Sequence, residues 1–368
     1  MGVLTIVAAW VAAGLGQVDV SPRLATARET HEVPAIAAVV VREGKVVARG
    51  VDGVRRAGDE TPATIDDLWH LGSCTKAMTA ALTATFVDEG VIAWETTLED
   101  ALPDLRDSMH ADFRHVTIRQ LLAHRAGIPS DLGFDGLWGR LWNHKGTPQE
   151  QRWLLTTEVL ARKPEHTPGT AFLYANAGYS VVGSILERRT GKPWETLIRE
   201  RLAEPLGMTA FGFGAPGVRG KADQPRGHDD RGKPVEPGPG SDNPPAIGPG
   251  GTCHASLDSW AKFIAMQVSG VRGESDFLTP DSFVALSTPA PGEDYALGWG
   301  VTTRPWARGE GGTGRVLTHA GSNTMWFAVA WLAPEKDLAI LVVCNRGGDR
   351  AAQACDAVAS TLVGEFAK

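Results

Sequence analysis

The stretch LGSCTK, residues 71–76, places a serine and a lysine three residues apart at the start of a predicted helix. Apolar residues recur at helical spacing up to Phe86, and Gly90 is a typical helix end, so we expect a helix over residues 74–89. Side chains at i and i+3 share one helix face and lean toward the N-terminus, which brings the Lys76 amine within reach of the Ser73 hydroxyl. This geometry suits a serine nucleophile with a lysine base.

A simpler interpretation is that Ser73 only caps the helix. A capping box would then place Glu or Gln three residues later, whereas Lys76 faces the positive end of the helix dipole at a cost of about 0.3–1 kcal/mol. Burial and that dipole would lower the lysine pKa and favour the neutral amine that can accept a proton. The pattern alone does not decide, because Ser259 and Lys262 have the same spacing.

The chain has 368 residues, of which 43% are hydrophobic and 21% charged, so it can bury a large core. Its net charge is -7, and no block of Lys and Arg occurs. These features argue against nucleic acid or an anionic membrane surface as a partner. We expect a small-molecule or peptide-like substrate, while the oligomeric state is left open.

Cysteine and histidine usage argues against a metal centre. The four cysteines show no CxxC spacing, and the ten histidines form no HExxH motif, so we expect neither metal nor cofactor. Cys74 is expected to be a small buried residue beside Ser73. Cys344 and Cys355 could form a disulfide, which spacing alone does not decide.

Residues 3–16 are apolar, too short to span a bilayer comfortably, and end in small residues. We interpret residues 1–18 as a signal peptide, which predicts a secreted or periplasmic protein. The n-region carries no Lys or Arg, so an apolar first helix in a cytoplasmic protein is the alternative.

The order of predicted elements indicates an α/β (α+β) fold. Strands are expected near both termini and helices between them, which suggests one antiparallel sheet flanked by helices with an inserted helical subdomain. The sheet subdomain would comprise residues of about 20–72 and 252–368, and the helical subdomain about 73–251. Residues 214–251, rich in Gly and Pro, are expected to form a long surface loop. The expected helices cover residues 22–32, 74–89, 116–124, 178–191, 193–207, 256–268 and 350–366. The expected strands cover a hairpin at 36–51 and residues 296–302, 315–319, 326–332 and 338–344.

Two further segments offer the remaining parts of a serine hydrolase. Tyr174 stands at a turn before a helix, where its phenol could share the serine proton, and the Asn176 amide could bind a substrate carbonyl. The run His319-Ala320-Gly321-Ser322 ends a strand, and the Ser322 N–H could join that of Ser73 in an oxyanion hole. Alternatively, Tyr174 anchors a loop and His319 touches solvent at a strand end.

The ordered set Ser73-x-x-Lys76, Tyr174-x-Asn176 and His319-x-Gly321 resembles the serine β-lactamase and penicillin-binding-protein-like family. The flanking text TIRQLLAHRAGIP, PGTAFLYANAGYSVVGSILERRTGKPWETLIRERLAEPLGM and YALGWGV strengthens the likeness, which runs from about residue 20 to the end. It is nearest to the class C β-lactamase branch with its esterases and D-aminopeptidases. The resemblance implies a β-lactamase/transpeptidase-like fold. It also implies that Ser73 is the acylated nucleophile and Lys76 its base. Tyr174 would then be the second proton carrier, and Asn176 the amide that orients the substrate.

The third motif departs from the β-lactamases and D,D-peptidases, which usually have Lys-Thr-Gly there. A histidine is mostly neutral at pH 7 if its pKa stays near about 6.5, so it suits a substrate carboxylate less well. Arg346 could supply that anchor, or it could be a solvated arginine at a strand end. No separate glutamate base is evident, so fast β-lactam hydrolysis is not expected.

We therefore expect an acyl-enzyme serine hydrolase acting on esters or amides, like the esterases and D-amino-acid peptidases. The alternatives are a β-lactamase or D-Ala-D-Ala carboxypeptidase, and a non-catalytic cell-wall-binding module. The last is suggested by the Gly- and Pro-rich loop and by Trp138, Trp142 and Trp153, although such clusters are more often core.

Overall fold

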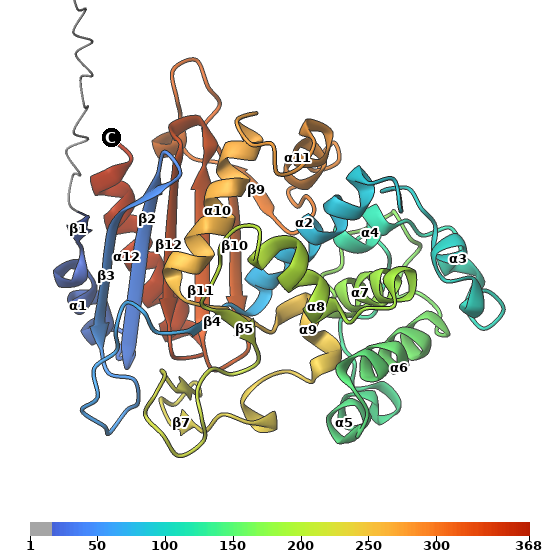
Figure 1. Cartoon of the computed structure of the whole chain (residues 1–368), viewed down its shortest axis with the longest axis horizontal. Coiled ribbons are helices and arrows are strands. Elements are labelled where there is room, and N and C mark those ends of the chain that lie inside the picture. Colours follow the sequence, from blue (N-terminus) through green and yellow to red (C-terminus); the bar gives the residue numbers. More distant parts are fainter. Residues whose placement is uncertain (1–16) are drawn as a thin grey trace, which may run out of the picture.

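The computed structural model describes residues 17–368, so the predicted signal peptide lies almost entirely outside the described residues. A broad sheet occupies one side of the molecule and a layer of helices the other (Figure 1). Within residues 17–368, no helix has the length and apolarity needed to cross a membrane.

The main sheet is built from both ends of the chain, as predicted. Its strand order is β1-β3-β2-β12-β11-β10-β9, and every neighbouring pair is antiparallel except β1 with β3. The central pair, β2 with β12, joins the N-terminal hairpin to the C-terminal strands, so two segments that are distant in the sequence form one sheet. The strands are β1 (Val18–Asp19), β2 (Ala35–Arg42), β3 (Lys45–Gly53), β9 (Gly300–Thr303), β10 (Arg315–Ser322), β11 (Phe327–Ala333) and β12 (Leu338–Cys344).

Helices cover both faces of this sheet, which explains why β2 and β12 read as unbroken apolar runs. Successive side chains point to opposite faces, so Ile340 packs with α1 (Ser21–Thr30) and α12 (Asp349–Phe366). Leu341 packs on the other face, in the core that also holds α2 (Thr75–Asp88) and α10 (Leu257–Val271).

The helical layer contains helices near the expected residues 116–124, 178–191 and 193–207, and further helices at 98–101, 137–143 and 148–160 that were not predicted as separate elements. Helix α6 starts with a capping box between Thr147 and Glu150, and α7 ends at Gly191, whose φ of 71° is the left-handed conformation that glycine adopts readily. The remaining helices are α3 (Leu98–Ala101), α4 (Ile118–Leu122), α5 (Leu137–Asn143), α6 (Pro148–Leu160), α7 (Asn176–Thr190), α8 (Trp194–Ile198), α9 (Gly248–Gly251) and α11 (Pro280–Ser287).

Two small sheets connect the layers. One has the order β4-β8-β5, with β4 (Trp69–His70), β8 (Cys253–Ala255) and β5 (Phe211–Phe213), and the other pairs β6 (Gly227–His228) with β7 (Pro234–Val235). Strand β4 leads directly into the residues that precede α2. The small sheet therefore fixes where the Ser73 segment begins. The subdomain boundaries given above stay predictions.

The expectation of a long surface loop over residues 214–251 was wrong in its last part. Ser241, Ala246 and Ile247 are buried, and all four residues of α9 are buried as well. The Pro249 carbonyl accepts a hydrogen bond from Thr79 Oγ1 at 2.7 Å, which seats α9 against α2. Gly and Pro allow this segment to pack closely against α2, so their abundance indicated tight packing rather than exposure.

Candidate active site

Ser73 lies in a short 3-10 turn, Gly72–Cys74, that runs into α2 at Thr75. No side-chain cap hydrogen bond forms at the start of this turn or of α2, so the serine is not used as a helix cap. Helix α2 is buried almost all round, which places the turn at the junction of the sheet and the helical layer. Cys74 is buried beside the serine, as predicted.

Lys76 is completely buried, and its amine has three oxygen neighbours. Nζ lies 2.6 Å from Asn176 Oδ1, 2.6 Å from the Gly250 carbonyl oxygen and 3.2 Å from Ser73 Oγ. Burial lowers the pKa of Lys76 to about 7. A neutral amine has two protons and one lone pair, and the two carbonyl oxygens can only accept. The lone pair is therefore left for the Ser73 hydroxyl proton.

Tyr174 borders the same amine, with its ring centroid 4.7 Å from Lys76 Nζ. Burial raises the pKa of Tyr174, and its hydrogen bond with Ser73 only partly offsets this rise. The phenol is thus protonated near neutral pH and is suited to share or return a proton. Asn176, expected to orient substrate, bonds to Lys76 and so also fixes the amine.

The end of β10 lies directly against the Ser73 turn. A Cβ on Gly321 would come 2.0 Å from the Leu71 carbonyl oxygen and 2.8 Å from Ser73 N, so only glycine fits. Gly72 has a φ of 49°, and a Cβ there would lie 2.4 Å from Ser322 N. The backbone nitrogens proposed for the oxyanion hole are therefore carried by two segments in direct contact.

His319 is buried in β10, contrary to the alternative of a solvent-exposed strand end. Its Nδ1 lies 2.7 Å from the Ala320 carbonyl, which can only accept, so Nδ1 carries the proton. Nε2 then accepts a hydrogen bond from the Tyr295 hydroxyl at 3.0 Å. Burial first, and then the charge of Lys76, lower the pKa of His319 to about 3, which makes the ring neutral.

Sequence reasoning missed the aromatic wall around these groups. All three tyrosines of the chain gather here: Tyr174, Tyr179 and Tyr295. The buried ring of His124 lies 4.3 Å from that of Tyr174 and accepts a hydrogen bond from the Ala175 N–H. The rarity of tyrosine was a usable signal, because a polar aromatic that occurs three times in 368 residues is a good candidate for a site.

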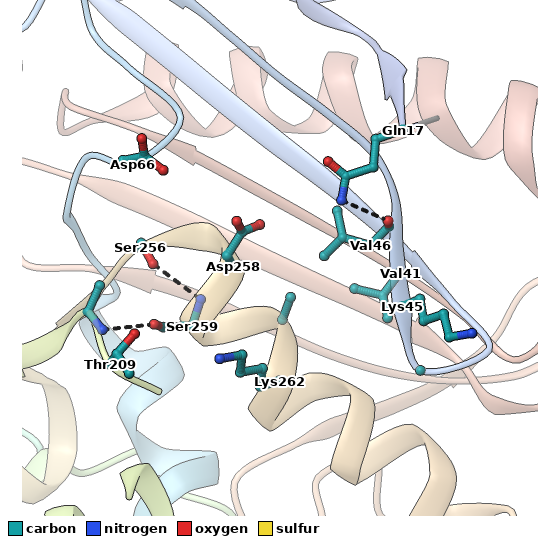
Figure 2. A pocket seen from close by; sticks show the side chains of 13 residues that line it. Gln17, Val41, Lys45, Val46, Asp66, Thr209, Ser256, Asp258, Ser259 and Lys262 are labelled. Carbon is teal, nitrogen blue, oxygen red and sulfur yellow. Dashed lines mark hydrogen bonds between the residues drawn. The ribbon is translucent and has the colours of Figure 1, made fainter. Parts of the chain in front are cut away.

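The second Ser-x-x-Lys match is structural. Figure 2 shows Ser259 and Lys262 at the wall of a different cavity of about 700 Å³, beside α10. Ser259 is buried, and its hydroxyl accepts a hydrogen bond from the Ala210 N–H at 3.1 Å. The exposed Lys262 amine instead donates to the Gly207 carbonyl.

Arg346 is neither a carboxylate anchor nor a solvated arginine. It is buried, and its two terminal nitrogens donate to the backbone carbonyls of Glu32 and Asp230. Both earlier interpretations were wrong, because the arginine links loops away from Ser73. All four cysteines lie within residues 17–368 and are free thiols, so Cys344 and Cys355 are not bridged.

No group of three or more His, Cys, Asp or Glu side chains within residues 17–368 is placed to hold an ion. The site described above consists of a serine, a buried amine, phenols, amides and backbone N–H groups.

Sequence comparisons place this chain among known proteins. The model of the Beta-lactamase family matches residues 20–362. Penicillin-binding protein 4 of Amycolatopsis lactamdurans is 30% identical over 181 residues, which cover 49% of this chain and 45% of that protein, less than half of its length. Protein Rv1367c of Mycobacterium tuberculosis is 28% identical over 350 residues, covering 83% of this chain and 84% of that protein.

Solved structures show the same fold. An octameric penicillin-binding protein homologue from Pyrococcus abyssi gives a TM-score of 0.74 at 23% identity, covering 93% of this chain and 76% of that one. D-alanine carboxypeptidase AmpC from Burkholderia cenocepacia gives 0.71 at 19% identity, covering 92% and 97%. A D-stereospecific amidohydrolase from Streptomyces sp. gives 0.69 at 22% identity, covering 91% and 97%. These likenesses confirm the predicted fold class.

Proposed function

The chain belongs to the beta-lactamase family of serine hydrolases, and from this premise we propose that it cleaves ester or amide bonds through an acyl-enzyme on Ser73. The Lys76 amine takes the Ser73 proton, and Oγ attacks the substrate carbonyl carbon. The N–H groups of Ser73 and Ser322 hold the oxyanion, while the Tyr174 phenol, with Lys76, passes the proton to the leaving group. Water then attacks the acyl carbonyl and releases the acid.

The observation that carries this proposal is the three-partner geometry of Lys76. Two carbonyl oxygens at 2.6 Å occupy both protons of the neutral amine, so its lone pair can face only Ser73 Oγ. A structural lysine would keep its charge and reach an acidic partner or solvent. Here its partners are neutral, and burial favours the form that acts as a base.

The environment of His319 supports the expected esterase- or D-amino-acid-peptidase-like activity over the β-lactamase or carboxypeptidase alternative. Because this ring is neutral and bonded to Tyr295, it offers no cation to a substrate carboxylate. We infer that substrates present an uncharged group to β10, as esters and neutral amides do. Among the structural neighbours, the D-stereospecific amidohydrolase supports a D-amino-acid amide as substrate, whereas the D-alanine carboxypeptidase supports the carboxypeptidase alternative.

The test is Ser73→Ala measured on a short-chain nitrophenyl ester, a D-amino-acid amide, a D-Ala-D-Ala peptide and a chromogenic cephalosporin. We expect the wild-type protein to prefer the first two, and the variant to lose at least about 10³-fold in kcat. Ser259→Ala is the matched control, because it removes the serine of the structural Ser-x-x-Lys match.

Intact-mass analysis after fluorophosphonate treatment decides between catalysis and a non-catalytic cell-wall-binding module. One covalent adduct that disappears in Ser73→Ala supports the acyl-enzyme. A wild-type protein that hydrolyses none of the four substrates and forms no adduct overturns the proposal. Preference for the cephalosporin or the D-Ala-D-Ala peptide would move the assignment to the β-lactamase or carboxypeptidase alternative.

A further inference from the structure

His70 lies two residues before the glycine–serine turn and is completely buried, with both ring nitrogens bonded. Nδ1 lies 3.1 Å from Gly72 N, and Nε2 lies 2.9 Å from Asp242 Oδ2. A backbone N–H can only donate, so Nδ1 must accept and carries no proton. The proton is therefore on Nε2, and it is donated to the Asp242 carboxylate. This single tautomer satisfies both contacts.

The other oxygen of the same carboxylate reaches the second segment of the site. Asp242 Oδ1 accepts from Asn323 Nδ2 at 3.2 Å. Asn323 directly follows Ser322, and its own Oδ1 accepts from the N–H groups of Met325 and Trp326, both at 3.2 Å. The buried amide therefore fixes the turn in which β10 ends.

The Asp242 carboxylate is thus linked to both segments that carry the proposed oxyanion-hole nitrogens. His70 connects it to the segment of Ser73, and Asn323 connects it to the segment of Ser322. Trp326 closes the arrangement, because its ring stacks on His70 at 5.6 Å and its carbonyl accepts from Ser322 Oγ at 2.8 Å. The side chains of Asp242, His70 and Asn323 are all nearly excluded from solvent. In such a buried environment a hydrogen bond is stronger than in water, and the loss of one partner is costly. The position of Ser73 N relative to Ser322 N therefore depends on this network.

We propose that Asp242, acting through His70 and Asn323, is the positioning residue of the oxyanion hole. The inference rests on the proposed function, because it gives the two N–H groups a catalytic role. Asp242 touches neither Ser73 nor the reacting atoms. Its effect is to hold two donors at the spacing that a developing oxyanion needs, which stabilises the transition state more than the bound substrate.

The test breaks the His70 branch of the network with His70→Phe and restores one of its hydrogen bonds with His70→Asn. Phenylalanine keeps the ring but loses both hydrogen bonds, so we expect kcat on the nitrophenyl ester to fall by about 10–100-fold while KM changes by less than about threefold. Asparagine places Oδ1 near the position of Nδ1, keeps an acceptor for the Gly72 N–H and should recover part of the lost kcat.

His254→Asn is the matched control. His254 pairs with His70 across the same small sheet, but its ring bonds to the Gly214 carbonyl instead of to the Ser73 segment. We expect this variant to keep wild-type kcat even if its Tm falls as far as that of His70→Phe. If His70→Phe keeps wild-type kcat, or if kcat falls equally in both variants, the inference is overturned.

Amide hydrogen exchange over residues 71–74, measured without substrate, tests the inference independently of turnover. Faster exchange in His70→Phe than in His254→Asn supports the positioning role, and equal exchange contradicts it. If the wild-type protein neither hydrolyses a substrate nor labels at Ser73, the proposed function fails. The exchange result then still shows whether His70 holds the turn.

Discussion

Burial sets the protonation state of two basic side chains in the candidate site. Lys76 and His319 expose almost no surface, and burial lowers their pKa values to about 7 and about 3. The consequences differ, because a neutral lysine gains a lone pair that can accept a proton, whereas a neutral histidine cannot bind a substrate carboxylate. One physical cause thus accounts for both the proposed base and the proposed substrate preference.

The pH dependence of turnover tests this at the residue scale. Lys76 must lose its proton before it can act as a base, so kcat/KM should be low below about pH 6, rise through about pH 7 and level off above about pH 8. Tyr174, whose pKa is raised by burial, stays protonated over this range. The measurement is kcat/KM on a neutral ester between about pH 5 and pH 9.

A matched substitution identifies the titrating group. Lys262→Met removes the lysine of the structural match and should leave the profile unchanged, whereas Lys76→Met should abolish most of the activity. A wild-type profile that does not level off and is still rising tenfold per pH unit at about pH 9 would contradict the assignment, because a solvated lysine has a pKa of about 10.4.

At the scale of elements, one arginine joins three helices of the helical layer. Arg152 on α6 is fully buried and bonds to Glu187 on α7 and, at 2.6 Å, to Glu195 on α8. Burial raises the pKa of Glu187, which the charge of Arg152 opposes. The alignment of α7, whose first residue is Asn176, therefore depends on the positive charge of Arg152. Removing that charge would leave the buried Glu187 carboxylate without its partner.

Arg152→Met should lower the free energy of unfolding by about 3–5 kcal/mol, because it strands a buried carboxylate. Equilibrium urea unfolding at about pH 7 measures the change. Arg140→Met is the control, since the Arg140–Glu158 pair at 2.9 Å is partly exposed and should contribute no more than about 1 kcal/mol. Equal losses in the two variants would show that Arg152 is not a buried anchor.

At the scale of the whole molecule, the site exists where the sheet meets the helical layer. The contact is made by Gly72 and Gly321, whose backbones approach too closely for any side chain. The two layers can therefore bring the Ser73 turn and β10 together only because both positions are glycine. Asp242 acts at the same junction.

Gly321→Ala should force β10 away from the turn and lower kcat by about 10²-fold or more, since a misplaced oxyanion donor costs about as much as a missing one. Gly364→Ala is the control. Nothing lies within 4 Å of a Cβ at Gly364 in α12, so this change should keep activity and stabilise the helix by about 0.5–1 kcal/mol. Steady-state kinetics and Tm of both variants decide, and a fully active Gly321→Ala would contradict the packing argument.

Local geometry let the sequence predict the reacting pair and most of the elements. The reach of Lys76 to Ser73 follows from i, i+3 spacing, and the hairpin of β2 and β3 follows from two apolar runs around Glu43-Gly44. The order of Ser73, Tyr174 and His319 indicated the family, which the match over residues 20–362 confirms. These features depend on contacts between near neighbours or on motif text, so the sequence alone determined them.

Tertiary structure alone decided what surrounds that pair. Lys76 bonds to atoms 100 and 174 residues away, and only the packing of α2 against α7 and α9 brings them together. Spacing could not separate Ser73 from Ser259, nor place Arg346 or Asp242. The physical reason is that burial and long-range contacts set pKa values and hydrogen-bond partners, and both depend on how the two layers pack against each other.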